Sequence, residues 1–147
     1  DFYNGFLFAV TNGLSLSGEP MPDPLVGSEF VAGLNKNTFR PYLQKWDIAM
    51  VMFYEGSDRL SIWAGKHLKK ASGMTQRPNH TFAAINCSQN EDFCVEQGVA
   101  NLPYFKMYSR GEDVGFSNNP RKLTFEDMKI WLEKFPVVLP CDQTIVT

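Results

Sequence analysis

Residues 48–72 read IAMVMFYEGSDRLSIWAGKHLKKAS, and this stretch decides the fold. Its first seven residues are apolar, several of them aromatic or branched, which is typical of a fully buried strand. After an interruption at Glu55 and Gly56, apolar residues recur at the spacing of one helix face. These residues are Leu60, Ala64, Leu68 and Ala71. The stretch therefore predicts a central strand that runs through a short turn into the N-terminus of a helix.

The turn between this strand and this helix is a favourable place for chemistry. Free backbone N–H groups and the positive end of the helix dipole face whatever lies there. A cysteine at such a position has a lowered pKa and becomes a reactive thiolate. The turn reads Ser57-Asp58-Arg59-Leu60-Ser61 and contains no cysteine. The group that would gain most from this position is therefore missing.

The length and charge of the chain limit the classes of partner. With 147 residues the chain fits one domain whose core needs no metal. The net charge of −2 gives no reason to expect nucleic acid or an acidic membrane surface as partner. No apolar run approaches the roughly 20 residues that span a bilayer, so we expect no membrane span in this chain. The start at Asp1 indicates either a removed signal peptide or a beginning inside a longer protein.

The three cysteines, Cys87, Cys94 and Cys141, are too few for a disulfide scaffold. They have no metal-ligand spacing with His67 or His80. We therefore predict neither a metal nor a cofactor.

Two sequons for N-linked glycosylation begin at Asn79 and Asn86. Asn79 lies in a polar loop ahead of a strand, where a glycan can be accommodated, and we predict occupancy there. Asn86 lies at a strand end beside Cys87, so we predict little or no occupancy.

The predicted elements follow the order β-α-β-α-β-α-β-β-α. Residues 1–27 begin aromatic and become rich in Gly, Ser and Pro. Three prolines lie between Glu19 and Leu25, so regular structure is not expected in that stretch. The predicted strands are 29–34, 48–54, 81–87, 104–108 and 113–116, and the predicted helices are 39–46, 60–72, 93–97 and 125–135. Helices between the first three strands indicate that these strands pair in parallel. The last two strands form a hairpin, which adds an antiparallel edge to the sheet.

This order predicts an α/β fold with a central mixed sheet flanked by helices. We expect the domain to cover residues 28–136. An N-terminal extension (1–27) would precede it, and a C-terminal tail or linker (137–147) would follow.

The predicted order is also that of the thioredoxin fold. From about Glu29 to Phe135 the chain resembles the thioredoxin-like domains of the protein disulfide isomerase family. The matching segments are Val51-Met52-Phe53-Tyr54, Phe82 to Ser88, and Gly98 to Pro103. Arg121, after Pro120, lies where many family domains carry an arginine before the last helix.

The resemblance aligns the Cys-x-x-Cys site of the family with Asp58-Arg59-Leu60-Ser61, so both cysteines are replaced. The buried acid of many catalytic members is Met52 here. Disulfide exchange needs an attacking thiolate and a second thiol that resolves the mixed disulfide. The resemblance therefore implies a domain without catalytic residues at this position.

Two interpretations of Asp58 and Ser61 remain. In the first, Asp58 is a general base and Ser61 a nucleophile. In the second, Asp58 caps the helix and stabilises it by about 0.3–1 kcal/mol. A serine nucleophile needs a positioned histidine, and the sequence places neither His67 nor His80 to reach it. We therefore favour the capping role.

Pro103 fits the position of the cis-proline of the family, which faces the helix N-terminus across the substrate groove. In active members the backbone of the preceding residue, Leu102 here, pairs with substrate. The resemblance thus implies a groove at Leu102, Pro103 and Tyr104. A proline that only shapes the turn into the strand is the alternative.

Some family members have a structural disulfide at the spacing of Cys87 and Cys94, and the resemblance implies that pair here. Two buried free thiols are the alternative. Cys141 follows the last helix, and in an oxidising compartment it would pair with another domain or chain.

These observations predict a redox-inactive thioredoxin-like domain of a secretory-pathway protein, in the endoplasmic reticulum lumen or secreted. It would bind protein partners or act as a scaffold or chaperone module. The alternatives are a thiol–disulfide oxidoreductase that uses Cys87, Cys94 or Cys141, and a secreted structural protein.

Overall fold

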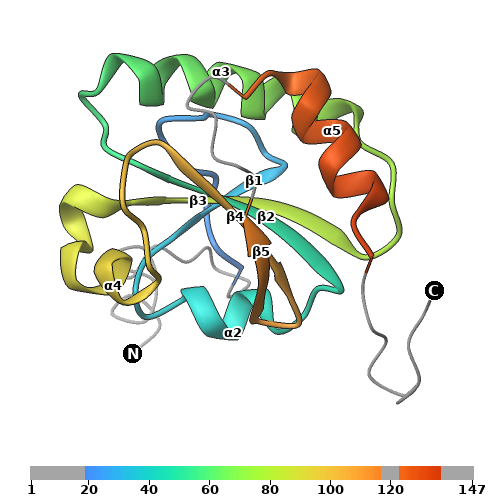
Figure 1. Cartoon of the computed structure of the whole chain (residues 1–147), viewed down its shortest axis with the longest axis horizontal. Coiled ribbons are helices and arrows are strands. Elements are labelled where there is room, and N and C mark those ends of the chain that lie inside the picture. Colours follow the sequence, from blue (N-terminus) through green and yellow to red (C-terminus); the bar gives the residue numbers. More distant parts are fainter. Residues whose placement is uncertain (1–18, 117–122, 137–147) are drawn as a thin grey trace, which may run out of the picture.

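The described part of the chain, residues 19–116 and 123–136 of the computed structural model, is built on one mixed sheet (Figure 1). Its strands are β1 (Val31–Leu34), β2 (Ile48–Tyr54), β3 (His80–Asn86), β4 (Tyr104–Ser109) and β5 (Glu112–Phe116). Their order across the sheet is β1-β3-β2-β4-β5. The first three strands pair in parallel, whereas β4 and β5 pair antiparallel, as predicted.

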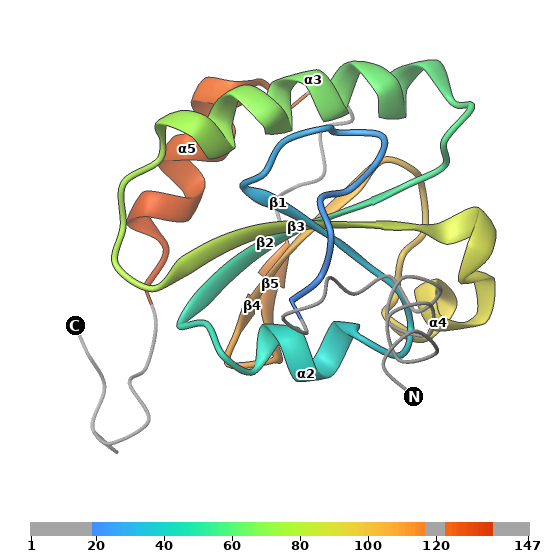
Figure 2. The same ribbon diagram turned by 180° about the vertical axis from the view of Figure 1, so that it is seen from behind.

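Helices cover both faces of this sheet. They are α2 (Phe39–Leu43), α3 (Arg59–Met74), α4 (Glu91–Glu96) and α5 (Phe125–Lys134), with a short 3-10 turn, η1 (Cys87–Gln89), before α4. Figures 1 and 2 show α3 and α5 on one face and α2 and α4 on the other. The thioredoxin-like α/β fold predicted from the sequence is therefore confirmed.

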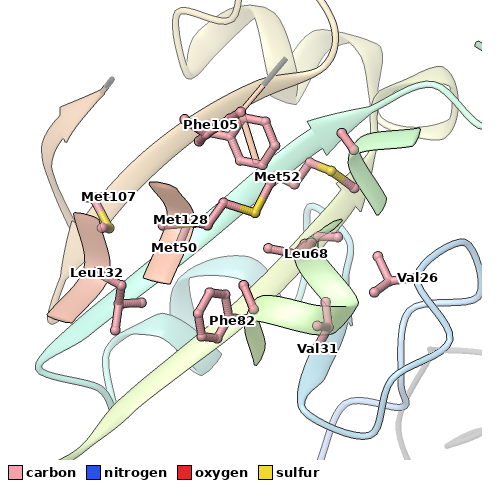
Figure 3. Packing of buried hydrophobic residues seen from close by; sticks show 14 of the residues in the cluster. Val26, Val31, Met50, Met52, Leu68, Phe82, Phe105, Met107, Met128 and Leu132 are labelled. Carbon is pink, nitrogen blue, oxygen red and sulfur yellow. The ribbon is translucent and has the colours of Figure 1, made fainter. Parts of the chain in front are cut away.

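The central strand β2 is buried along its whole length because it has a neighbour on each side and helices over each face. Met50 and Met52 point to the face of the sheet that α3 and α5 cover, in one cluster with Leu68 of α3 and Phe105 of β4 (Figure 3). The alternate residues of β2 belong to a second cluster, under α2 and α4. Burial on both faces explains why the strand reads as a continuous apolar run.

The segment before β1 packs on the sheet although it contains no helix or strand among residues 19–27. Pro22 forms an isolated antiparallel bridge with Ala32, and the Gly33 N–H donates to the Met21 carbonyl at 2.8 Å. Val26 is buried in the cluster beneath α3. This strap, residues 19–27, therefore covers the free edge of β1. The division of the chain at residue 27 stays a prediction.

The element ends differ slightly from the predicted ones. The helix predicted to reach Trp46 ends at Leu43, because Lys45 and Trp46 donate their N–H groups three residues back, as in a tighter turn. The first strand begins at Val31, since a turn closed by the bond from the Val31 N–H to the Ser28 carbonyl precedes it. Arg121, Cys141 and the proposed tail lie outside the described residues.

Candidate functional site

The N-terminus of α3 follows the carboxyl end of β2 through a turn at residues 55–57. Asp58 is the N-cap of the helix, and its Oδ2 accepts from both the N–H and the hydroxyl of Ser61, each at 2.9 Å. This is the geometry by which a carboxylate satisfies free N–H groups at a helix start. Asp58 thus has the capping role favoured from the sequence.

Ser61 is not placed as a nucleophile. Its side chain is completely buried, and its Oγ accepts from the Glu55 N–H at 3.3 Å while donating to Asp58. Both hydrogen-bonding functions of the hydroxyl are therefore used inside the protein.

The two histidines are engaged elsewhere. The Nδ1 of His67 accepts from the Phe125 N–H at 3.0 Å, and its ring lies 4.2 Å from the ring of Trp63. His80 lies at the start of β3, at the opposite end of the sheet, and its Nδ1 donates to the Arg77 carbonyl. The arrangement therefore contains no Asp-His-Ser relay.

A buried carboxylate lies close to the end of β2, in a residue that sequence reasoning missed. Asp23 of the strap is 2% exposed, and its Oδ2 accepts from the Tyr54 hydroxyl at 2.9 Å. Its Oδ1 accepts from the backbone N–H groups of Leu25 and Val26. Burial raises the pKa of the Asp23 carboxyl, against the opposing effect of the bonds it accepts. Burial and the nearby carboxylate also raise the pKa of Tyr54.

A local signal for Asp23 exists in the sequence. An aspartate directly before a proline starts turns, because its side chain bonds the backbone N–H groups two or three residues later. The sequence gives no sign that Tyr54, on a distant strand, completes the arrangement.

The Leu102–Pro103 peptide bond is cis, as the resemblance implies. Pro103 is buried, and Tyr104 pairs with Phe53 at the end of β2. The half-buried Leu102 lines a groove beside this loop.

This groove, which we call the α4 groove, has a volume of about 390 Å³. Its lining residues are Glu55, Cys87, Ser88, Glu91, Cys94, Val95, Val99, Ala100 and Leu102. The structure thus brings Leu102 together with Cys87 and Cys94. Glu55, from the turn before α3, also lines the groove, whereas none of Asp58 to Ser61 does.

Cys87 and Cys94 form a disulfide with their Cα atoms 5.9 Å apart, within the usual range for such bonds. The bond joins the start of η1 to α4, and both residues are at most 6% exposed. The predicted pair is therefore confirmed, and the alternative of two free thiols is wrong for this structure.

The two sequons differ in their surroundings. Asn79 is exposed and has a positive φ of 51°, in the turn before β3. The Asn86 Oδ1 accepts from the Ser88 N–H at 3.0 Å and from the Ser88 hydroxyl at 2.7 Å. Glycan occupancy at either residue stays a prediction.

Within residues 19–116 and 123–136, no three His, Cys, Asp or Glu side chains come together as a metal site would require. None of the helices in this part is long and apolar enough to cross a bilayer.

No family model matches the chain. Among curated proteins, it is 25% identical over 89 residues to a protein disulfide-isomerase of Saccharomyces cerevisiae, covering 56% of this chain and 16% of that protein. It is 28% identical over 86 residues to human thioredoxin domain-containing protein 16, covering 58% of this chain and 10% of that protein. The chain thus spans less than a fifth of the length of these relatives.

Solved structures also support a thioredoxin-like fold for this chain. The zinc-bound form of human ERp44 superposes with a TM-score of 0.63 at 19% identity, covering 69% of this chain and 30% of that one. A single-residue variant of thioredoxin from Halobacterium salinarum NRC-1 superposes with a TM-score of 0.58 at 16% identity, covering 74% of this chain and 92% of that one. The chain therefore contains a thioredoxin-like domain that is related to the protein disulfide isomerase family.

Proposed function

We propose that this domain is a redox-inactive module that binds segments of other proteins. The observation that carries the proposal is the state of the α3 N-terminus, where a buried Ser61 is held between Asp58 and the backbone of Glu55. Disulfide exchange at this position needs a thiolate, which a serine hydroxyl with both hydrogen-bonding functions engaged cannot replace.

The cysteines of the described residues support this proposal. Cys87 and Cys94 are bonded to each other away from the α3 N-terminus, on a corner between a strand and a helix. A bond in that place acts as a staple for η1 and α4.

The α4 groove is the binding surface that we propose. Val95, Val99, Ala100 and Leu102 give it an apolar wall, and Val95 is 73% exposed. Glu55 and Glu91 add carboxylates to the lining. Exposed apolar side chains beside a concave surface favour an unfolded or extended protein segment as ligand.

The redox half of the proposal is tested by insulin reduction with dithiothreitol, followed as turbidity. We expect a rate equal to that without protein. A rate clearly above background that Cys87→Ser or Cys94→Ser abolishes would show that the domain is an oxidoreductase.

The binding half is tested with reduced, carboxymethylated α-lactalbumin as a permanently unfolded probe. Val95→Asp should weaken binding severalfold, because it puts a charge on the apolar wall. Val114→Asp is the matched control, since Val114 is also exposed, at 40%, but lies on β5. Equal binding by the two variants would rule out the α4 groove as the surface.

One observation favours the alternative oxidoreductase. Cys87 and Cys94 line the α4 groove, so a ligand thiolate could approach them there. The insulin assay with the cysteine variants distinguishes this function from the binding role. A secreted structural protein is the third candidate, and it predicts neither activity.

We further propose a secretory compartment, in the endoplasmic reticulum lumen or outside the cell. The disulfide supports it, because such bonds persist in oxidising compartments. The exposed sequon at Asn79 supports it too. Since the chain covers only 30% of the ERp44 chain, we expect neighbouring domains, and Cys141 is a candidate for a bond to one of them.

A further inference from the structure

A second cavity, of about 430 Å³, lies at the opposite end of the sheet from Asp58 and Ser61. It forms where the strap, α2, the last turn of α3 and the start of β3 meet. Figure 2 shows how α3 leads into β3, which brings the C-terminus of the helix to this end. The proposed binding in the α4 groove does not involve it.

The last turn of α3 gives this cavity a negative potential. Ser72, Gly73 and Thr75 line it, and the C-terminal carbonyl groups of a helix carry partial negative charge that favours cations. The last turn of α3 contains no basic residue. The nearby Lys70 does not line the cavity, and its Nζ lies 4.1 Å from the centre of the Phe125 ring.

Two carboxylates add to this potential. Glu19 and Glu29 line the cavity, and among the described basic side chains only His80 does, with its Nδ1 bonded to the Arg77 carbonyl. Glu19 lies 3.8 Å from Lys45, but both side chains are more than half exposed, so this pair is weak and screened. Glu29 makes no ion pair with any described residue.

Aromatic side chains form the rest of the recognition surface. Phe30 is 55% exposed, and the rings of Tyr42 and Trp46 lie 5.9 Å apart. Cations are attracted to the faces of such rings. The Tyr42 hydroxyl is fixed by a 2.6 Å bond with the Thr81 hydroxyl.

The indole N–H of Trp46 is buried and has no hydrogen-bond partner among the described residues. Unsatisfied buried donors are uncommon in folded proteins. The Trp46 side chain lines the cavity, so its indole N–H signal reports on a ligand bound there.

We propose that this cavity binds an arginine side chain from an extended segment of a partner protein. A guanidinium group stacks on aromatic rings and pairs with carboxylates at the same time, as this lining requires. The carboxylates and the helix end repel an anionic ligand, and they hold a cationic donor more strongly than a neutral one. Residues 1–18 contain no lysine or arginine, so this part of the chain cannot supply the side chain.

The test is a titration of the full ¹⁵N-labelled chain with acetyl-Gly-Arg-Gly-Arg-Gly-amide, followed at the tryptophan indole N–H signals. The Trp46 signal, assigned with Trp46→Phe, should shift saturably, while the signals of Trp63 and Trp131 stay in place. The same peptide with glutamine for arginine should give no shift. Glu19→Gln with Glu29→Gln should weaken binding about fivefold.

The matched control is Glu96→Gln with Glu126→Gln, because both residues are exposed and lie outside the cavity. It should bind the arginine peptide as the unmodified chain does. Equal loss of affinity in both double variants would overturn the proposal, as would a shift with the glutamine peptide. A Trp46 shift that depends on protein concentration without peptide would identify a second copy as occupant and also overturn it.

Discussion

Asp58 and Ser61 stabilise the start of α3 with bonds that a pair of cysteines cannot make. The carboxylate accepts two hydrogen bonds from Ser61, and this serine in turn accepts from the backbone of Glu55. At this position the chain contributes stability, of about 1 kcal/mol for the cap, where a related oxidoreductase would carry a reactive group.

Restoring the cysteines, with Asp58→Cys and Ser61→Cys, should give a domain that forms a disulfide but exchanges it poorly. The helix N-terminus still favours a thiolate. Met52 is buried and cannot transfer a proton, a contribution usually worth about 10²–10⁴-fold. We expect insulin reduction at least about tenfold slower than that of a Cys-x-x-Cys domain measured in parallel. Comparable rates would show that the surroundings matter little.

Asp23 makes stability depend on pH. Burial raises the pKa of its carboxyl above the ordinary 3.8, so the folded state holds this proton more tightly than the unfolded state. The contribution of Asp23 to the free energy of unfolding therefore falls as pH rises from 3.8 through the raised pKa. The Asp23→Asn variant lacks this titration. As pH rises through that interval, its free energy of unfolding should therefore increase relative to that of the unmodified chain. Urea unfolding from about pH 4 to 8 measures the difference, and parallel curves would contradict the prediction.

At the scale of elements, α3 packs against the rest of the domain through one apolar face of the helix. Ala64, Leu68 and Ala71 are completely buried against the sheet and α5, whereas Ile62 is 38% exposed. The helix reads as amphipathic in the sequence for this reason.

Leu68→Ala should lower the free energy of unfolding by about 2–5 kcal/mol, because it leaves a cavity between α3 and the sheet. Ile62→Ala is the matched control on the exposed side of the same helix and should cost less than about 1 kcal/mol. Chemical denaturation followed by circular dichroism gives both values. Similar losses would mean that α3 packs through a different face.

The sequence predicts elements well where one physical rule dominates. The run from Ile48 to Tyr54 is apolar throughout because β2 is buried on both faces, and its predicted ends agree with the structure. The end of α2 and the start of β1 depend on turn hydrogen bonds that no periodicity encodes. Asp23 was missed because its partner, Tyr54, lies 31 residues away and meets it only in the folded chain.

At the scale of the whole molecule, the sheet separates two apolar clusters and has a different surface at each end. The end with the α3 N-terminus, the cis-proline loop and the disulfide was predicted from residues that resemble a known family. The cavity at the other end was not, because its lining residues come from the strap, α2, α3 and β3, which are distant from one another in the sequence.

Only one of the two sequons should be glycosylated. When the chain is made in a eukaryotic secretory system, we predict a glycan at Asn79, which is exposed in a turn. We predict little or none at Asn86, whose side chain is bonded to Ser88. Intact-mass measurement before and after glycosidase treatment tests this, with Asn79→Gln as the control that should lose the mass difference. A chain without any glycan would remove one support for the secretory compartment.

The cysteines connect fold, compartment and function. If the protein folds in an oxidising lumen, the Cys87–Cys94 bond is closed in the native source, and Cys141 is the remaining cysteine. Alkylation under denaturing, non-reducing conditions, followed by peptide mass mapping, should then label Cys141 alone or find it joined to another domain or chain. Label on both Cys87 and Cys94 would contradict the disulfide, and the case for an oxidising compartment would then rest on the sequons and the family resemblance. Label on both residues would also leave two thiols lining the α4 groove, which is the arrangement that the oxidoreductase alternative requires.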